Sequence, residues 1–577
     1  MRWWASLRTR LEVSEVSRTP QWLFTTVLFG IAIALLVGAC GGSRKKAGSV
    51  APVPDGSAPT VAAADTRTFP IFRIATDPSI DYLDPGLTYT IAGSAVLWNA
   101  YLPLVGYKHV NGPDGATIVP YLARALPKVS SDGKTYTLAL RTGLEYSNGQ
   151  AVKASDFAYA IERVFQLDSP GAAFFRGIVG ADSYAKTKRG HIAGIVTNDS
   201  TGQITIHLIA PQGDFDNILA TEFAAPVPAG TPAKDQSTAP IPSTGPYMIK
   251  KYAPDNEIVE VRNPHFDAAV FDGQVPAGHP DEIVWNIVGS NEAALERVIA
   301  GKDDWDGFHA IPADKLASVR RRYHGEIKSY IQPNTYYFFM NTRVAPFTSL
   351  DVRRAVNYAI DRKELVRLYG GLAVPTENII PPTNPQYAAH RFYPHDLARA
   401  RRLVARSGFK GAHVTVWCPQ FGTDVKASKY LVAVLRAIGF HADERIVSSA
   451  AYWSTIGKEA TKAQIGFADW FQDYPHPLDW FDVLLNGTRI TKTNNSDYAN
   501  FDDPAVNAKI DALKRQPRLT RAVNGEWAAV DGAIMRQAPW VPFLNRQFID
   551  FFSRRVDLSC YVNQVVYGFD YATACVR

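Results

Sequence analysis

The sequence predicts an α/β protein built from more than one lobe. At 577 residues the chain is longer than an ordinary single domain, and its 46% apolar and 20% charged residues are the composition of a folded globular protein. Strand-like apolar runs are followed closely by amphipathic helices at several places, as at residues 335–359. The length and this alternation together favour two or three lobes with ample core.

The amino-terminal 40 residues resemble a targeting segment. Four arginines precede an apolar stretch over residues 22–39, and these are Arg2, Arg8, Arg10 and Arg18. The stretch ends at Val37-Gly38-Ala39-Cys40, which resembles a bacterial lipobox. We therefore expect residues 1–39 to be a lipoprotein signal peptide and Cys40 to carry lipid, the alternative being an uncleaved membrane anchor. Residues 40–66 are rich in Gly, Ala, Ser and Pro and are predicted to form a flexible linker.

The first half of the folded chain shows clear strand, turn and helix signals. A strand is predicted near residues 71–76, where Asp77-Pro78 ends it. The turns Ser131-Asp132-Gly133 and Asn148-Gly149 flank a half-buried strand. A helix should follow, with Ser155 as its N-cap. Its apolar face is formed by Phe157, Ile161, Val164 and Phe165.

The stretch from Thr335 to Pro382 carries the clearest pattern in the second half. Residues 335–340 read as a buried strand, and a helix follows with one apolar face, formed by Val352, Ala355, Val356 and Ala359. Asp361 with Glu364 predicts the N-terminus of a second short helix, and Gly370-Gly371 predicts its end. Two further strand and helix units are expected between residues 400 and 447.

These segments, in this order, resemble the large extracytoplasmic solute-binding proteins of ABC importers, family 5, which includes oligopeptide-, dipeptide- and nickel-binding lipoproteins. The resemblance covers roughly Phe69 to Phe552 and leaves only the cysteine-bearing tail without a match. The segments that carry it are IDYLDP at 80–85, residues 118–165, STGPYMIKKYAPDNEIVEVRNPHF at 243–266, and residues 339–382 from FMNT to the Pro-Pro pair.

The resemblance implies a two-lobed, periplasmic-binding-protein type II-like α/β fold, with an extra subdomain in the first lobe and a hinge between the lobes. The expected division is a lobe I core from residues 67–95, 226–332 and 537–577, a subdomain at 96–225, and lobe II at 333–536. The chain is expected to cross between lobes near residues 226–240, 333–342 and 537–545.

The strongest candidate for a binding site is the loop at residues 468–475, where acidic residues stand beside aromatic ones. In peptide-binding family members the aspartate of the matching DY..P motif takes the peptide's amino terminus, which implies this role for Asp473, with Trp470 as a wall. The alternative is that Asp473 caps a turn and the aromatic residues are core. Weaker candidates, each with an alternative role in a turn, cap or core, are Asp77, Asp81, Tyr82, Asp84, Asn341, Trp417, Gln420 and Phe421.

Other classes of site have little support in the sequence. No P-loop, H-E-x-x-H or paired C-x-x-C motif is present and the histidines are dispersed, so we expect no enzymatic activity, no cofactor and no dedicated metal site. The net charge of +6 comes from arginines spread along the chain, which argues against nucleic-acid binding. Cys560 and Cys575 could form a disulfide in an oxidising compartment, whereas Cys418 reads as a buried thiol.

The function that the resemblance implies is capture of a solute, with oligopeptides as the leading class, and its delivery to ABC permease subunits driven by a cytoplasmic ATPase. The protein would be a monomer, lipid-anchored on the outer face of the bacterial cytoplasmic membrane. The alternatives are a binder of a non-peptide solute such as an oligosaccharide or metal chelate, and an extracytoplasmic sensor or hydrolase on the same fold.

Overall fold

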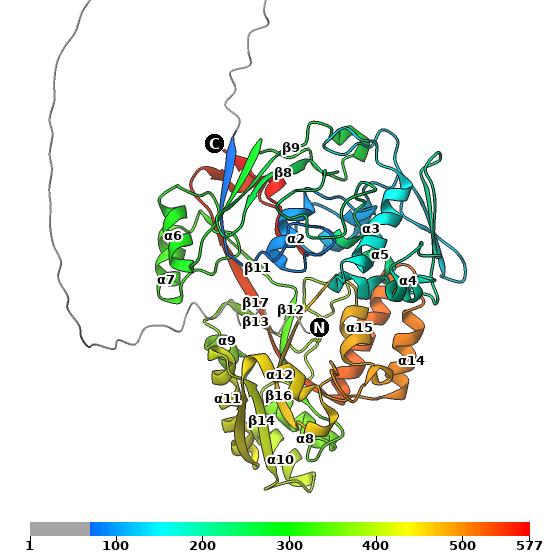
Figure 1. The fold of residues 1–577 in the computed structure, drawn as a ribbon. Coiled ribbons are helices and arrows are strands. Elements are labelled where there is room, and N and C mark those ends of the chain that lie inside the picture. The colour runs from blue at the N-terminus through cyan, green and yellow to red at the C-terminus, as the bar shows by residue number, and fades with distance from the viewer. Residues whose placement is uncertain (1–69) are drawn as a thin grey trace, which may run out of the picture.

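The computed structural model describes residues 70–577, so the expected signal peptide, Cys40 and the linker lie outside the described residues. The described chain forms two lobes of mixed helices and strands, as Figure 1 shows. The predicted two-lobed α/β architecture is therefore confirmed. No helix within residues 70–577 is both long enough and apolar enough to cross a membrane.

The first lobe is organised around a four-stranded sheet whose central strand is β10. Parallel pairing joins β1 to β10, whereas β9 and β8 continue the sheet in antiparallel order. The bounds are β1 (Ile71–Thr76), β8 (Tyr247–Ala253), β9 (Glu257–Arg262) and β10 (Glu282–Ile287), with α2 (Ile91–Trp98), α6 (Asn291–Ile299) and α7 (Ala313–Arg322). Gly245 precedes β8 and packs so closely on the chain at Asn99 that a Cβ there would lie 2.3 Å from the Asn99 carbonyl oxygen.

A subdomain of the first lobe has its own sheet and core. Its sheet runs β4 (Lys128–Val129), β5 (Thr135–Ala139), β7 (Gln203–His207) and β6 (Ile195–Asn198), beside α3 (Ala154–Gln166), α4 (Ala181–Thr187) and α5 (Phe215–Ile218). The predicted apolar face of α3 is buried. The prediction of Ser155 as N-cap is wrong: it lies in the first turn, while the Asp156 carboxylate accepts the Lys153 N–H at 2.9 Å.

The second lobe packs helices on a sheet whose central strand, β12 (Asn334–Met340), is buried along its whole length. Asp361 caps α9 (Arg362–Leu368) through the N–H groups of Lys363 and Glu364, as predicted. The other strands are β13 (Ala373–Pro375), β14 (His413–Pro419), β15 (His441–Val447) and β16 (Ile465–Phe471). The other helices are α8 (Leu350–Ala359), α10 (Leu397–Arg406), α11 (Gly422–Ile438), α12 (Ser449–Ile456), α13 (Leu478–Leu484), α14 (Pro504–Leu513) and α15 (Arg521–Gln537).

One long strand, β17 (Trp540–Phe551), runs from the second lobe toward the first (Figure 1). Its first half pairs with β12, and its second half, residues 547–551, pairs with β11 (Ile327–Ile331). The connection from β11 to β12 runs beside it, and the crossings expected near residues 333–342 and 537–545 stay predictions. The third expected crossing, near residues 226–240, also stays a prediction; there the Gln236 N–H donates to Asp84, and the Thr231 carbonyl accepts from Tyr159.

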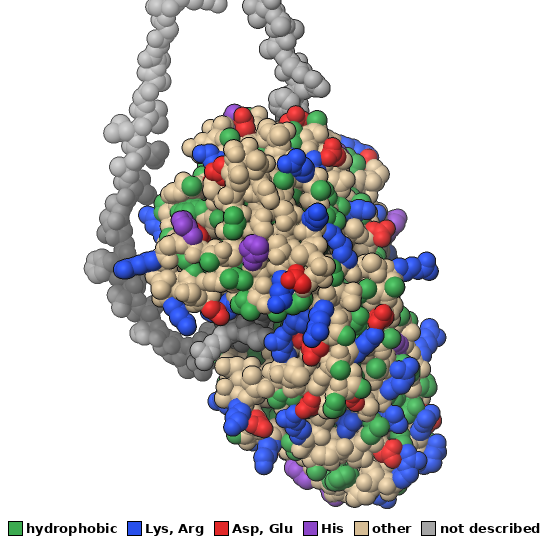
Figure 2. All heavy atoms as spheres, turned by 90° about the vertical axis from the view of Figure 1, so that its right-hand side faces the viewer, with side chains coloured by type: hydrophobic (Ala, Val, Ile, Leu, Met, Phe, Trp, Pro, Cys, Tyr) green, Lys and Arg blue, Asp and Glu red, His purple; other side chains and the backbone are tan. Residues whose placement is uncertain are grey.

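The tail after β17 returns to the first lobe as short paired strands. These are β18 (Val556–Asp557) with β21 (Cys575–Val576), and β19 (Asn563–Gln564) with β20 (Gly568–Phe569). A disulfide joins Cys560 to Cys575 and closes the loop that contains β19 and β20. On the face drawn in Figure 2, Lys and Arg side chains are scattered over both lobes, with Asp and Glu side chains among them.

Candidate functional site

A cavity of about 360 Å³ lies between the two lobes. The first lobe supplies Asp77, Ser79 and residues 89–92 at the start of α2, together with Phe308 and the tail at residues 563–568. The second lobe supplies the start of β12, the first turn of α11 and the end of β16. Nine of the 26 lining residues are aromatic, namely Tyr89, Phe308, Tyr330, Tyr336, Tyr369, Phe421, Phe471, Phe548 and Tyr567. Its size and apolar walls fit a small organic ligand.

Tyr89 is held at the cavity by Asp81, the acidic residue at the start of the preceding loop. The Asp81 carboxylate accepts hydrogen bonds from the Tyr89 N–H at 2.9 Å and from the hydroxyls of Thr88 and Thr90, both at 2.9 Å. The loop is therefore folded around one carboxylate. Across the cleft, the Tyr89 hydroxyl donates to Asp473 Oδ1 at 3.4 Å.

Asp473 belongs to a small group of acidic side chains just beyond the end of β16. Asp479 Oδ2 accepts the Asp473 N–H at 3.0 Å and the Trp470 Nε1–H at 3.1 Å, which fixes both residues. Burial raises the pKa of Asp473 to about 6. The pKa of Asp479 lies well above its usual value because of burial and of the neighbouring Asp473 charge. Two carboxylates that are costly to ionise side by side would be stabilised by a ligand cation.

The lining of the cavity also includes a cation. Arg546 on β17 lines the cavity beside Tyr336 and Tyr369, with its guanidinium carbon 5.9 and 5.8 Å from the two ring centres. The Tyr369 hydroxyl donates to Asp424 Oδ1 at 2.7 Å. The charged residues of the lining are therefore Asp77, Asp424 and Arg546, and Asp473 lies beside the cavity.

The tail forms one wall and is fastened to the first lobe. Gln564 Nε2 donates to the Gly115 carbonyl at 2.6 Å, and the Tyr567 ring stacks on Trp98 at 4.7 Å. The Asp570 carboxylate lies 2.6 Å from His109 Nδ1. These contacts and the disulfide hold residues 563–568 against the cavity.

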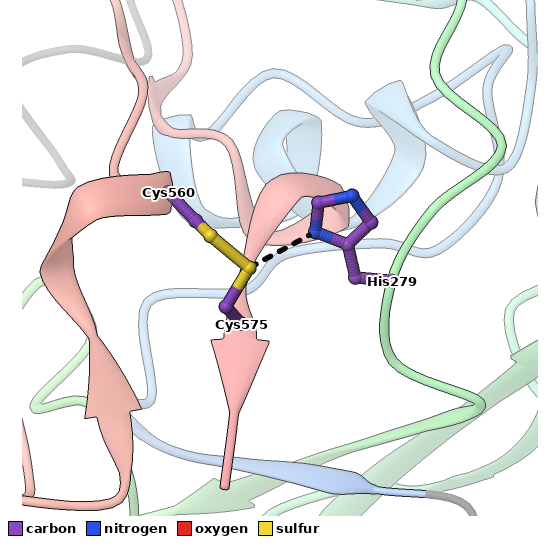
Figure 3. A group of neighbouring side chains, drawn as sticks. All are labelled: His279, Cys560 and Cys575. Atoms are coloured by element: carbon purple, nitrogen blue, oxygen red, sulfur yellow. Dashed lines mark hydrogen bonds between the residues drawn. A yellow bond between two sulfur atoms is a disulfide. The ribbon is translucent and has the colours of Figure 1, made fainter.

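His279 stands beside this disulfide (Figure 3). Within residues 70–577 it is the one place where three potential His, Cys, Asp or Glu ligands have donor atoms within 4.8 Å of one another. The two sulfurs are bonded to each other, and the His279 Nδ1 lies 2.9 Å from the Thr573 carbonyl oxygen. Metal binding by cysteine requires the thiolate, so the group as it stands offers a metal only the imidazole.

The residues proposed from sequence fall into two sets. Phe421 lines the cavity, and Asp473 and Trp470 belong to the acidic group beside it. Asp84 instead is fully buried in a double hydrogen bond to Arg163, at 2.7 and 2.6 Å.

The other three proposed residues also have packing roles away from the cavity lining. Trp417 is buried in the second-lobe core with Arg445 4.6 Å above its ring. Asn341 holds the turn after β12 through Ala463 and Arg343. Tyr82 contributes its backbone to the loop around Asp81.

Several site residues escaped the sequence reasoning. No local motif in the sequence marks Tyr89, Asp479 or Arg546. The family resemblance covers roughly Phe69 to Phe552 and does not extend to the tail. An acidic residue four positions after Tyr474-Pro475 was visible in the sequence as Asp479, but its link to Asp473 and Trp470 depends on the fold.

Comparisons with known proteins agree with this architecture. The chain is 26% identical over 469 residues to heme-binding protein A of Haemophilus influenzae, covering 77% of this chain and 82% of that protein. It is 24% identical over 461 residues to the glutathione-binding protein GsiB of Salmonella typhimurium, covering 77% and 83%. Among solved structures, the clavulanic acid biosynthesis oligopeptide binding protein 2 aligns with a TM-score of 0.77 at 25% identity, covering 88% of this chain and 94% of that one.

The family model for the middle part of the bacterial extracellular solute-binding proteins of family 5 matches residues 117–492. This range takes in the subdomain, the strands around β12, and the loop that carries Asp473. It spans well over half of the 577 residues, and the chain therefore belongs to family 5 of the bacterial extracellular solute-binding proteins, the substrate-binding components of ABC importers.

Proposed function

We propose that this protein captures short oligopeptides in the cavity between its lobes and delivers them to the permease subunits of an ABC importer. The observation that carries the proposal is the pairing of Tyr89 with Asp473 across the cleft, next to the buried Asp479. The ammonium group of a peptide would supply the positive charge that the neighbouring carboxylates of Asp473 and Asp479 lack. Aromatic walls then accept side chains of many shapes without reading them individually.

Binding and lobe closure are linked in this proposal. A ligand that contacts Asp473 in one lobe and the Tyr89 loop in the other favours the closed arrangement, since it interacts with both lobes only when they are together. The closed, loaded form is what the permease receives. Lipid attachment at Cys40, a monomeric state and a place on the outer face of the cytoplasmic membrane complete the proposal.

Mass spectrometry of the purified full chain in detergent tests the peptide assignment. The mass of the intact protein under native conditions is compared with its mass after denaturation, and anything released is fragmented. Peptides that co-purify with the native chain, and are absent from an Asp473→Asn preparation, support the assignment. A released sugar, chelate or tetrapyrrole overturns the peptide class while leaving the binding role intact.

A second candidate is a non-peptide solute. The aromatic residues of the lining support it, because such side chains also stack against flat ring systems, and one similar protein carries the name heme-binding. A thermal-shift series with free peptides, glutathione, hemin and oligosaccharides separates the two. The true ligand class raises the unfolding temperature with a saturating concentration dependence.

A further inference from the structure

The two sulfurs of the disulfide between Cys560 and Cys575 have different surroundings. Both cysteines are partly exposed, and the exposed His279 stands beside them (Figure 3). The His279 Nδ1 lies 3.4 Å from the Cys575 Sγ, within hydrogen-bond distance of a sulfur. No hydrogen bond within residues 70–577 reaches the Cys560 Sγ. A hydrogen-bond donor is therefore placed at one sulfur of the pair and not at the other.

The surrounding chain determines which nitrogen of His279 carries the proton. Its Nδ1 also lies 2.9 Å from the Thr573 carbonyl oxygen, and because a carbonyl oxygen can only accept, Nδ1 is the N–H nitrogen. The backbone N–H of His279 donates to the Ala572 carbonyl at 2.8 Å, which holds the ring beside the tail. The Nδ1–H is therefore shared between the Thr573 oxygen and the Cys575 sulfur, where it would stabilise negative charge.

Negative charge develops on one sulfur when a thiol opens a disulfide. The incoming thiolate forms a bond with the attacked sulfur, the bond between the two cysteines breaks, and its electron pair stays on the other sulfur as a thiolate. The sulfur with the more stable thiolate leaves faster. In this protein the donor stands at Cys575, so attack at Cys560 with departure of Cys575 is the favoured direction.

We propose that Cys560 is a site of reversible modification by small thiols, which form a mixed disulfide with it while Cys575 leaves as a thiolate that accepts from the His279 N–H. One S–S bond breaks, one forms, and the charge of the attacking thiolate passes to Cys575. A second thiolate that attacks the mixed disulfide releases the oxidised small thiol and leaves Cys560 reduced, so that two thiols supply the two electrons of a full reduction.

The strands next to the disulfide allow the bond to form again. Asp557 on β18 pairs with Cys575 on β21, so Cys575 remains close to the segment that carries Cys560 after the bond opens. The chain between the two cysteines includes residues 563–568, which form a wall of the cavity. Modification of Cys560 therefore loosens this wall, and return of the Cys575 thiolate restores it.

The test uses the full chain in detergent with 2-mercaptoethanol, a small uncharged thiol. Samples are quenched with N-ethylmaleimide at set times and digested without reductant. Chymotrypsin is suitable because Tyr561, Tyr567 and Tyr571 separate the two cysteines. Mass spectrometry should find mercaptoethanol on Cys560 and maleimide on Cys575, both at the same rate. Cys418 should remain unmodified, since it is buried and burial raises the pKa of its thiol to about 12.

Variants of His279 test its part in the exchange. His279→Ala should slow the modification roughly tenfold, because the leaving thiolate loses its donor. His279→Asn, whose amide offers an N–H near the position of Nδ1, should keep part of the rate. His265→Ala is the matched control, since His265 is an exposed histidine of the same lobe that contacts Glu145 instead, and it should react like the unmodified protein.

The direction of the change separates this proposal from a merely structural role of His279. If His279 only held the tail in place, His279→Ala would expose the disulfide and speed its modification, which unfolding temperatures of the variants would accompany with a decrease. Modification at an unchanged or faster rate in His279→Ala, mercaptoethanol on Cys575 in place of Cys560, or a disulfide that the thiol does not open in the folded protein would each overturn the inference.

Discussion

The Tyr89 hydroxyl donates a hydrogen bond to Asp473 Oδ1 at 3.4 Å, although the two residues are 384 positions apart in the sequence and belong to different lobes. The contact lies beside the cavity, so the Asp473 carboxylate is placed to take part both in contacts between the lobes and in ligand binding. The four predictions that follow test this site and the structure that supports it.

Replacing Asp473 by Asn should weaken binding of peptides with a free amino terminus by about 2–5 kcal/mol, because the ligand ammonium loses its charged partner in a desolvated site. Isothermal titration calorimetry measures the change. N-acetylated peptides should bind both proteins alike. Asp272→Asn is the control, since Asp272 is 73% exposed and pairs with Arg141, and neither residue lines the cavity. Equal affinities of the Asp473→Asn and unmodified proteins for free peptides would remove Asp473 from the site.

Replacing Asp84 by Asn should destabilise the fold by about 3–5 kcal/mol, because it leaves the Arg163 guanidinium buried without its counter-ion. Chemical denaturation measures the loss. The exposed pair of Arg176 with Asp182 is the control, and Asp182→Asn should cost about 0–1 kcal/mol. If Asp84→Asn lowered ligand affinity in the folded protein without lowering stability, Asp84 would be a ligand residue after all.

The stability of the first lobe should depend on pH through Glu260. Burial raises the pKa of this carboxyl from 4.5 to about 8, although Trp285 and Tyr571 donate hydrogen bonds to it. The stabilising contribution of its bound proton is therefore complete below pH 4.5 and is lost as the pH rises through 8, an effect on the order of 5 kcal/mol.

Unfolding free energies measured from pH 4.5 to 9 test this relationship. Glu260→Gln should flatten the decline and be more stable than the unmodified protein at the alkaline end. Glu257→Gln, at the start of the same strand, should follow the unmodified curve. A decline that persists unchanged in Glu260→Gln would assign it to other groups.

Reduction of the disulfide between Cys560 and Cys575 should lower both stability and ligand affinity. The bond closes a loop of 15 residues, which corresponds to about 3 kcal/mol of stability. Residues 563–568 within that loop form a wall of the cavity, so loosening them should weaken binding. The measurements are unfolding temperature and affinity with and without dithiothreitol. The Cys560→Ser, Cys575→Ser double variant should match the reduced protein and no longer respond to the reductant.

Local signals in the sequence predicted much of the fold. The buried strand at 335–340, the Asp361 cap and the Gly370-Gly371 helix end depend on neighbouring residues only, and each is present in the structure. The Ser155 cap was misplaced because the helix begins one residue earlier, at Ala154, and the Ser155 hydroxyl donates to the distant Asp199 instead.

Residues of the site were harder to predict because their partners are distant in sequence. Asp84 was a candidate ligand residue because of its loop, but its carboxylate accepts a hydrogen bond from Arg163, which is 79 positions later in the sequence. Arg546 stands in an apolar strand with no motif around it, and only the pairing of β17 with β12 and β13 brings it to the cavity. The DY..P resemblance pointed to Asp473, whereas Tyr89, its partner in the structure, gave no signal.

The path of the long strand β17 has a consequence for the rate at which a ligand is released. Its residues up to Leu544 are hydrogen-bonded to β12 and those from Gln547 to β11, so the backbone between them is where the strand passes from one lobe's pairing to the other's. Arg546 occupies this junction. Because Arg546 also lines the cavity, a ligand in the cavity would touch this stretch of backbone, and we expect substitutions there to change how long a ligand stays bound as well as how tightly.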